Sequence, residues 1–378
     1  MKAANHRPSQ IKIDLSAVQF NYRQIMNHLP EETKGIAVIK ADGYGHGALE
    51  VARALEVEVD AFAVAVSDEA LELRQEGIRT ELIVLGYTDP EDASLHADQD
   101  IGLTILSLAW LEETCSHLKT DSSLKLHLKV DTGMSRLGVR SVEEAQEIVD
   151  FIAEHPERLI LESVFTHHAT ADSKEESHQD QVDSQTALFQ NYQENLDFSS
   201  LRQEPYFHQS NSALSLWYPE LTLDAVRLGI ALYGINPSNR AIALPYELKP
   251  ALSLESEIAF VKQMKGQEKI SYGAAYEAEK DEWIASLPLG YADGWQRRYE
   301  AGYALVDGKK CPFAGRICMD QCMISLPRYY PVGTKVTLVG ENGGERISLE
   351  SIADQADTIA YELACLFTDR LSRKYSSK

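Results

Sequence analysis

The stretch GIAVIKADGYGHGALEVARALEVEVDAFAVAV, residues 35–66, joins two apolar runs through an amphipathic segment. The runs, Gly35–Lys40 and Asp60–Val66, are short and apolar, as buried parallel strands are. Between them, apolar residues recur at the spacing of one helix face, at Ala48, Val51, Ala52 and Leu55. The stretch therefore predicts a strand, a helix and a second strand parallel to the first.

The same unit recurs along the chain. Six further runs of this kind follow before residue 235: Glu81–Gly86, Ile101–Leu106, Leu124–Val130, Leu159–Thr166, Pro205–His208 and Ala225–Leu228. The segments between them carry helical spacing, and an amphipathic pattern from Leu15 to Leu29 predicts one more helix before the first strand. Eight alternating strand and helix units place the chain in the α/β class and predict a (β/α)8 TIM-type barrel.

After Pro237 the pattern changes to short strands broken by Gly, Pro and Asp-Gly turns. The predicted strands include Glu257–Gln263, Trp283–Leu287, Ala304–Val306, Gly315–Cys322 and Lys335–Val339, and the last helix is expected near Leu349–Ala356. We therefore expect a barrel over residues 1–238 and a C-terminal antiparallel β domain over residues 239–378. Whether the first residues pack with the β domain is left open.

Composition restricts the classes of partner. Lys and Arg total 36 against 58 Asp and Glu, a net charge of −22 that repels nucleic acid and anionic membranes. No apolar run resembles a signal peptide or reaches the roughly 20 residues of a membrane helix. Five cysteines fit reduced thiols in the cytoplasm. Cys318 and Cys322 lack a matching pair at zinc-ligand spacing, so no metal site is predicted.

Lys40 closes the first predicted strand. Barrel enzymes carry their chemistry at the carboxyl ends of the strands, so polar residues there have the most weight. Partial burial would lower the pKa of this lysine and favour the neutral amine that attacks an aldehyde. Taken alone, Lys40 is better explained as a lysine that extends from the barrel rim into solvent.

The fifth strand leads into Lys129-Val130-Asp131-Thr132-Gly133-Met134-Ser135-Arg136. Alternation along a strand points Lys129 and Asp131 to one side. The planar fork of Arg136 suits a substrate carboxylate, although an Asp131–Arg136 ion pair that shapes the loop is an equal alternative.

The ends of strands six to eight carry further polar residues. His167 follows strand six, Asn211 and Ser212 follow strand seven, and Arg227 lies in strand eight just before Gly229. The loops after strands seven and eight are the usual phosphate site of a barrel. A serine hydroxyl and a glycine that permits close approach of backbone N–H groups fit that use.

These residues resemble the alanine racemase family, the barrel-type enzymes that use pyridoxal 5'-phosphate (PLP). The similarity covers nearly the whole chain. It rests on AVIKADGYGHG at residues 37–47, KVDTGMSRLG at 129–138, TH at 166–167, NSA at 211–213 and VRLGI at 226–230. In the second domain it rests on SYG at 271–273, GYADG at 290–294 and GRICMDQ at 315–321.

The resemblance implies a PLP site. Lys40 would hold the cofactor as a Schiff base, His167 would pack on its pyridine ring, and Arg227 would bond the ring nitrogen. The residues that would hold the phosphate are Tyr44, Ser212, Gly229, Ile230 and Tyr361, and Asn211 is included among the cofactor-binding residues.

The resemblance also implies a two-base racemase acting on alanine. Removing a proton from one face and returning it on the other needs two bases, here Lys40 and Tyr272. Tyr272 would come across a homodimer interface. Arg136 and the backbone of Met319 would position the substrate carboxylate, and Tyr291 would line the entrance. The product, D-alanine, would supply cell-wall peptidoglycan.

Lys129 is expected to be a carbamate, as in many members of the family. Its anionic group would offset the neighbouring cations and hold Arg136. If Lys129 stayed unmodified, Asp131 or a bound chloride would balance the charge instead. One departure from the family is that its closing Arg-Val-Pro-Arg becomes Arg370-Leu371-Ser372-Arg373, which leaves the dimer contacts there open.

Three alternatives remain. A PLP-dependent decarboxylase would need an acidic partner for the ring nitrogen where this chain has Arg227. A non-catalytic PLP-binding protein would not need Tyr272. A racemase that also accepts serine is compatible with the same residues.

Overall fold

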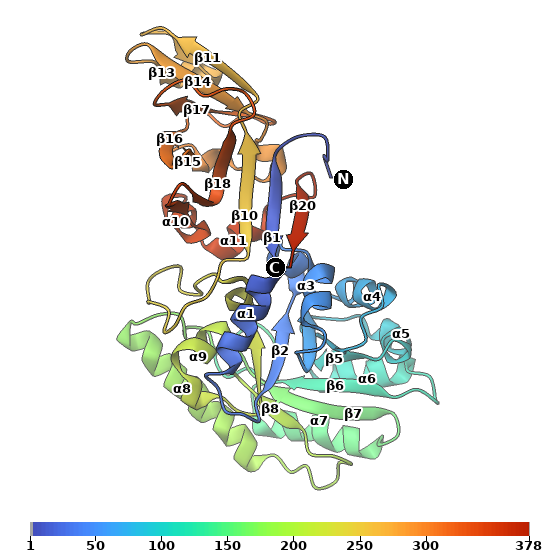
Figure 1. Ribbon diagram of the computed structural model, residues 1–378. Coiled ribbons are helices and arrows are strands. Elements are labelled where there is room, and N and C mark those ends of the chain that lie inside the picture. The colour runs from blue at the N-terminus through green and yellow to red at the C-terminus, as the bar shows by residue number, and fades with distance from the viewer. Residues whose placement is uncertain (1–2, 378) are drawn as a thin grey trace.

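The computed structural model describes residues 3–377, which form two lobes stacked one above the other (Figure 1). The lower lobe is the barrel, and the upper lobe contains the strands of the C-terminal half. Strand β1 (Gln10–Asp14) is the first element, lies in the upper lobe and leads directly into helix α1 (Leu15–Met26) of the lower lobe.

Eight parallel strands form the barrel and confirm the predicted fold. They are β2 (Lys34–Val38), β3 (Ala61–Val64), β4 (Glu81–Val84), β5 (Ile101–Ile105), β6 (Leu124–Lys129), β7 (Leu159–Phe165), β8 (Tyr206–His208) and β9 (Ala225–Leu228). Their order is β8-β7-β6-β5-β4-β3-β2-β9. A single parallel bridge between Ser210 and Val226 joins β8 to β9 and closes the ring.

Helices surround the strands because each has one apolar face. In addition to α1 they are α3 (Ala48–Leu55), α4 (Ser67–Gln75), α5 (Ala93–Asp98), α6 (Leu108–His117), α7 (Val142–Glu154), α8 (Glu176–Asn195) and α9 (Ser212–Trp217), with short 3-10 helices at η1 (Pro90–Asp92), η2 (Pro219–Leu221) and η3 (Ile230–Tyr233). Asp14 starts α1 by accepting the backbone N–H groups of Ser16 and Ala17. In α3, Val51, Ala52 and Leu55 are the buried face.

The upper lobe is built mainly from antiparallel strands, as predicted, and only β1 and β20 pair in parallel among its described strands. A seven-stranded sheet contains β16 (Lys309–Pro312), β15 (Tyr303–Val306), β18 (Lys335–Asn342), β10 (Leu252–Glu257), β1 and β20 (Ser372–Ser376) in that order, with β19 (Glu345–Ile347) paired to β18. Smaller sheets join β11 (Phe260–Met264), β14 (Glu282–Leu287) and β17 (Cys322–Leu326), and β12 (Lys269–Ile270) with β13 (Tyr276–Glu277). The first residues therefore pair with the C-terminal sheet, because β1 lies between β10 and β20.

Three details of the second domain differ from the sequence prediction. The predicted strand Glu257–Gln263 is the end of β10 and most of β11, separated by a turn. Of the predicted strand Gly315–Cys322, only Cys322 lies in β17. The residues before it form a loop, because Gly315 has a φ of +78°, which ends an extended run. Helix α10 (Leu349–Gln355) is not the last, since α11 (Ala360–Cys365) follows it.

Candidate active site

Lys40 lies at the start of an unusual turn directly after β2. Residues 41–44 of α2 (Lys40–Tyr44) have φ values of +53°, +52°, +59° and +52°, which form one turn of left-handed helix. Each non-glycine residue in this conformation costs roughly 1–2 kcal/mol. Asp42 offsets part of that cost by accepting the backbone N–H of Ala48 at 2.9 Å. The turn points Tyr44 into the protein, and only 8% of this residue is exposed.

The environment of Lys40 favours its neutral amine. Burial lowers the pKa of Lys40, and the nearby Arg136 lowers it further, whereas Glu69 acts in the opposite direction. Glu69 also accepts the backbone N–H of Ala41 at 2.6 Å, so one carboxylate fixes the turn and faces the lysine. A more nucleophilic lysine at neutral pH follows.

Arg227, in β9, is almost fully buried. Its NH1 donates to His208 Nδ1 at 2.6 Å, and its NH2 donates to the carbonyls of Thr166 at 2.6 Å and Gln209 at 3.2 Å. Within residues 3–377 its Nε makes no hydrogen bond, so one donor of the guanidinium is available to a ligand. Burial lowers the pKa of Arg227 to about 9, which leaves it a cation at neutral pH.

Lys129 ends β6 and is 6% exposed. Burial lowers its pKa well below the usual value, and Arg227 and Arg136 lower it further. Asp131 accepts the backbone N–H groups of Gly133 and Ser135 at 3.0 and 2.9 Å. In the described chain no ion pair joins Asp131 to Arg136, so this carboxylate shapes the loop through backbone groups.

The loops after β8 and β9 form a cluster of donors. Ser212 Oγ accepts the backbone N–H of Gly229 at 2.8 Å and of Ala231 at 3.4 Å. A Cβ on Gly229 would lie 2.7 Å from the Tyr44 hydroxyl, so only glycine lets Tyr44 approach this backbone. Hydroxyl and backbone N–H donors that converge in this way are the chemistry that binds a phosphate.

Neighbouring residues complete this cluster. Asn211 accepts the backbone N–H of Leu214 at 3.0 Å and so sets the start of α9, next to Ser212. Ile230 is buried at the start of η3. The ring centroid of Tyr361 lies 6.2 Å from that of Tyr44. The structure thus brings together all the residues predicted to surround a phosphate.

His167 lies at the mouth of the barrel beside Arg227, with its Nδ1 3.5 Å from Arg227 NH2. Burial lowers the pKa of His167 well below the usual value, and Arg227 adds to the effect. The histidine is therefore neutral and can pack on a flat ligand.

Three predicted residues, Tyr272, Tyr291 and Met319, lie in the other lobe and are 73%, 42% and 54% exposed. They share one surface, because Tyr291 N–H donates to the carbonyl of Cys318, and Ser271 next to Tyr272 donates to that of Arg316. They lie in or beside η4 (Tyr272–Ala274) and η5 (Tyr291–Asp293). Figure 1 places β13, which follows η4, at the end of the upper lobe far from the barrel. One chain alone does not bring Tyr272 to Lys40.

The sequence analysis missed the contacts of several residues. His208 is the main partner of Arg227, and its place as the last residue of a predicted strand was the available signal. Arg370 and Arg373 both make contacts: Arg370 pairs with Asp293 and Asp320, and Arg373 donates to the carbonyl of Gly45 at 2.9 Å. Arg370 and both of its partners lie in the upper lobe, whereas the bond from Arg373 to Gly45 joins the two lobes. Nothing in the sequence pattern indicates these contacts.

Fold and site together define a barrel enzyme with a partly desolvated lysine beside a phosphate-type cluster of donors. Models of the "Alanine racemase, N-terminal domain" and "Alanine racemase, C-terminal domain" match residues 13–237 and 251–375. The chain belongs to the alanine racemase family, a family of isomerases.

Individual relatives agree with this assignment. An alanine racemase of Listeria monocytogenes is 46% identical, with 98% of each chain covered. The solved structure of an alanine racemase from E. faecalis is 41% identical, with a TM-score of 0.94 and 100% of both chains covered. A histidine racemase from Leuconostoc mesenteroides is 34% identical, with a TM-score of 0.92 and 100% of both chains covered.

No described helix is both long and apolar enough to cross a membrane. No group of three or more His, Cys, Asp or Glu among residues 3–377 is arranged to hold a metal ion.

Proposed function

We propose that this protein interconverts L-alanine and D-alanine with PLP held on Lys40. The observation that carries the proposal is a set of four basic side chains at the barrel mouth, Lys40, Lys129, Arg136 and Arg227, which make no ion pair within residues 3–377. In a chain of net charge −22, such a set fits anionic ligands. The cofactor phosphate and the carboxylate of an amino acid are anions of that kind.

The donor set fits PLP. Tyr44, Ser212, Tyr361 and the backbone at Gly229 and Ile230 would hold the phosphate, with Asn211 fixing the loop. The free Nε of Arg227 would donate to the ring nitrogen, and His167 would pack on the ring. Because a guanidinium keeps its proton, Arg227 would leave the ring nitrogen unprotonated, which disfavours transamination.

PLP, when bound, supplies an electron sink that makes the α-proton of the attached amino acid acidic. Lys40 Nζ would take or return that proton on one face, and the Tyr272 hydroxyl of a second copy of the chain would do so on the other. Arg136 and the backbone of Met319 would hold the substrate carboxylate. A carbamate on Lys129 would orient Arg136, and Tyr291 would line the entrance.

The active site is proposed to be shared in a homodimer. The support is the separation of Tyr272 from Lys40 within one chain, together with the exposure of Tyr272, Tyr291 and Met319 on one surface. We also propose residues 1–238 and 239–378 as the two domains, with β1 paired into the sheet of the second.

The biological role follows from the reaction. D-Alanine made in the cytoplasm would supply peptidoglycan. The histidine racemase relative acts, by its name, on a larger amino acid within the same fold, so substrate breadth needs a direct test that includes serine and histidine.

The test is to follow optical rotation as purified protein acts on L-alanine, with serine and histidine in parallel. We expect rotation to decay to zero with alanine, and Lys40→Ala to abolish the decay while the circular dichroism spectrum stays native. Borohydride should fix the cofactor on Lys40. An unchanged rotation with alanine, or a label on Lys34 or Lys129, would contradict the proposal.

A further inference from the structure

A chain of buried polar side chains crosses the inside of the barrel below Arg227. Arg227 NH1 contacts His208 Nδ1 at 2.6 Å, His208 Nε2 contacts Ser163 Oγ at 3.0 Å, and Ser163 Oγ contacts His127 Nδ1 at 2.8 Å. His208, Ser163 and His127 are at most 1% exposed. Three successive strands, β8, β7 and β6, carry these three residues.

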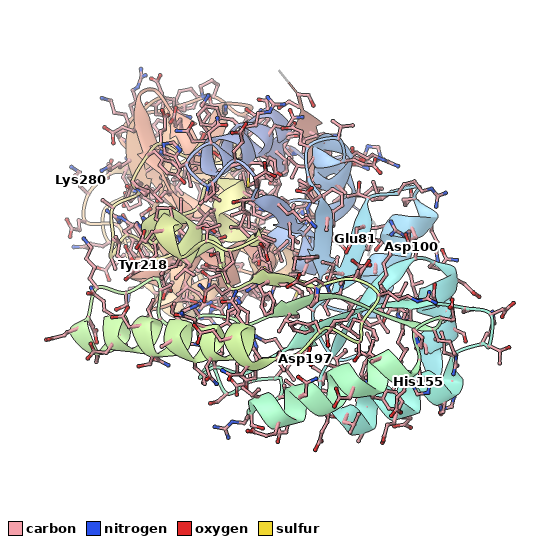
Figure 2. The ribbon with its side chains drawn as sticks, turned by 90° about the horizontal axis from the view of Figure 1, so that it is seen from below. Glu81, Asp100, His155, Asp197, Tyr218 and Lys280 are labelled. Atoms are coloured by element: carbon pink, nitrogen blue, oxygen red, sulfur yellow. The ribbon has the colours of Figure 1, made fainter. Side chains whose placement is uncertain are left out.

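The row of buried polar side chains ends at the opposite rim of the barrel. His127 Nε2 lies 3.8 Å from Glu81 Oε1, and neither atom has a hydrogen-bond partner among the described residues. Glu81 begins β4, next to Asp100 at the start of β5, and Figure 2 labels both residues close together on the barrel seen from below. The polar path therefore runs from the ligand side of the barrel to its other end.

The direction of each hydrogen bond is fixed by Arg227. A guanidinium has donors only, so His208 Nδ1 must accept, and the single proton of a neutral His208 is on Nε2. That proton is donated to Ser163 Oγ. Among the described hydrogen bonds, His127 Nδ1 is the acceptor left for the serine proton, so His127 carries its proton on Nε2, towards Glu81.

Both histidines are neutral, as this direction requires. Burial lowers the pKa of His127 to about 3. Burial and the charge of Arg227 lower the pKa of His208 well below the usual value. Each ring therefore has one donor nitrogen and one acceptor nitrogen.

The fold makes room for this row of polar side chains at two places. The pairing of β6 with β7 shifts between Leu126 and His127, which sets His127 directly opposite Ser163. Such a bulge redirects side chains. A Cβ on Gly102 of β5 would lie 2.5 Å from His127 Nε2, so only glycine leaves space for the ring.

We propose that His208, Ser163 and His127 form a one-way hydrogen-bond relay that orients the Arg227 guanidinium, and that Ser163 and His127 are positioning residues. NH1 and NH2 are held from the barrel interior, which leaves Nε directed to a ligand. The role toward a cofactor rests on the proposed function, whereas the direction of the relay does not. Neither residue touches the ligand loops, so they act through His208.

The direction is tested by nitrogen NMR of the purified protein labelled with 15N-histidine. We expect His208 and His127 both to be protonated on Nε2 and unprotonated on Nδ1, with signals assigned through loss in His127→Asn and His208→Asn. A proton on Nδ1 of either ring would overturn the relay. This measurement needs no activity, so it stands apart from the racemase test.

The positioning role is tested with Ser163→Ala in the PLP-bound protein. Thr104→Val is the control for loss of a buried hydroxyl. Thr104 pairs with His127 in the register of β5 and β6, but its hydroxyl is fully buried, donates to the Val84 carbonyl at 2.7 Å and makes no hydrogen bond to the relay within the described residues. Loss of one hydrogen bond predicts cofactor release about fivefold faster in Ser163→Ala. The turnover number should fall while the KM for alanine changes little. Ser163→Thr should restore the rate of cofactor release and the turnover number.

Two results would overturn the role of Ser163. One is a release rate and turnover number in Ser163→Ala equal to those of Thr104→Val. The other is a rate of cofactor release in Ser163→Ala equal to that of the wild-type protein. If wild-type protein binds no PLP, the proposed function fails, and the tautomers still decide whether the relay exists.

Discussion

Gly45 ends the left-handed turn after Lys40 and touches the C-terminal helix α11. It has a φ of +79°, and a Cβ there would lie 2.2 Å from the carbonyl oxygen of Ala364. Contact between such atoms normally needs about 3.5 Å, so Gly45→Ala forces a backbone shift of about 1 Å. We expect the free energy of unfolding to fall by about 1–2 kcal/mol because of the left-handed conformation and by about 1–3 kcal/mol because of overpacking.

Gly77→Ala is the matched control. Gly77 has a φ of +94°, and nothing lies within 4 Å of an added Cβ. Its substitution should cost only the conformational part, about 1–2 kcal/mol. Replacing glycine by alanine also stiffens the unfolded chain, and the stability gained in this way is common to both variants. The difference in stability between the two variants therefore isolates the contact with α11.

The assay combines thermal unfolding with cofactor retention. Gly45→Ala should melt a few degrees below Gly77→Ala. It should also release PLP faster, because α11 carries Tyr361, whose ring lies 6.2 Å from that of Tyr44. Gly77→Ala should retain the cofactor like wild type. Equal melting temperatures and equal retention in the two variants would refute the reasoning.

Three further predictions concern the charges and the second chain. Lys129→Ala should lower turnover and substrate affinity about tenfold, with partial rescue by chloride or acetate; a bare ammonium on Lys129 in high-resolution electron density would remove the carbamate. Mixing inactive Lys40→Ala and Tyr272→Phe chains should restore part of the activity; no recovery after verified subunit exchange would count against shared sites. Attachment of PLP to stripped protein should reach its plateau below pH 10.5, because the pKa of Lys40 is lowered. Arg136→Leu removes one cause of that lowering, so its profile should move to higher pH; an unmoved profile would contradict this electrostatic role.

The barrel was predictable because each strand and helix is specified locally. The eight apolar runs all became strands, with ends that differ by a few residues. The second domain was less predictable, because its strands pair across long sequence separations and turns decide where each begins. Gly315 illustrates the limit: a glycine in an apolar run suggests a strand, and only its positive φ shows the loop.

The candidate site was predictable to the extent that it lies at strand ends. Lys40, Arg227 and Ser212 could be placed from their position in the repeat alone. The contacts of His208 and Ser163 could not be predicted, because they depend on which side chains face each other inside the barrel. That register includes a bulge between β6 and β7, for which the sequence gives no signal.

The orientation of Arg227 is a property of the barrel itself. Its acceptors come from Thr166, His208 and Gln209, at the ends of neighbouring strands whose spacing is fixed by the sheet. Rotating the guanidinium would leave buried charged donors unpaired, at a cost of about 1.5–3 kcal/mol for each hydrogen bond lost. A ligand that gains one hydrogen bond from Nε cannot offset two or three such losses. The donor must therefore point the same way before and after a ligand binds, and the sheet, rather than the ligand, determines which atom of Arg227 would meet the ring nitrogen of the proposed cofactor.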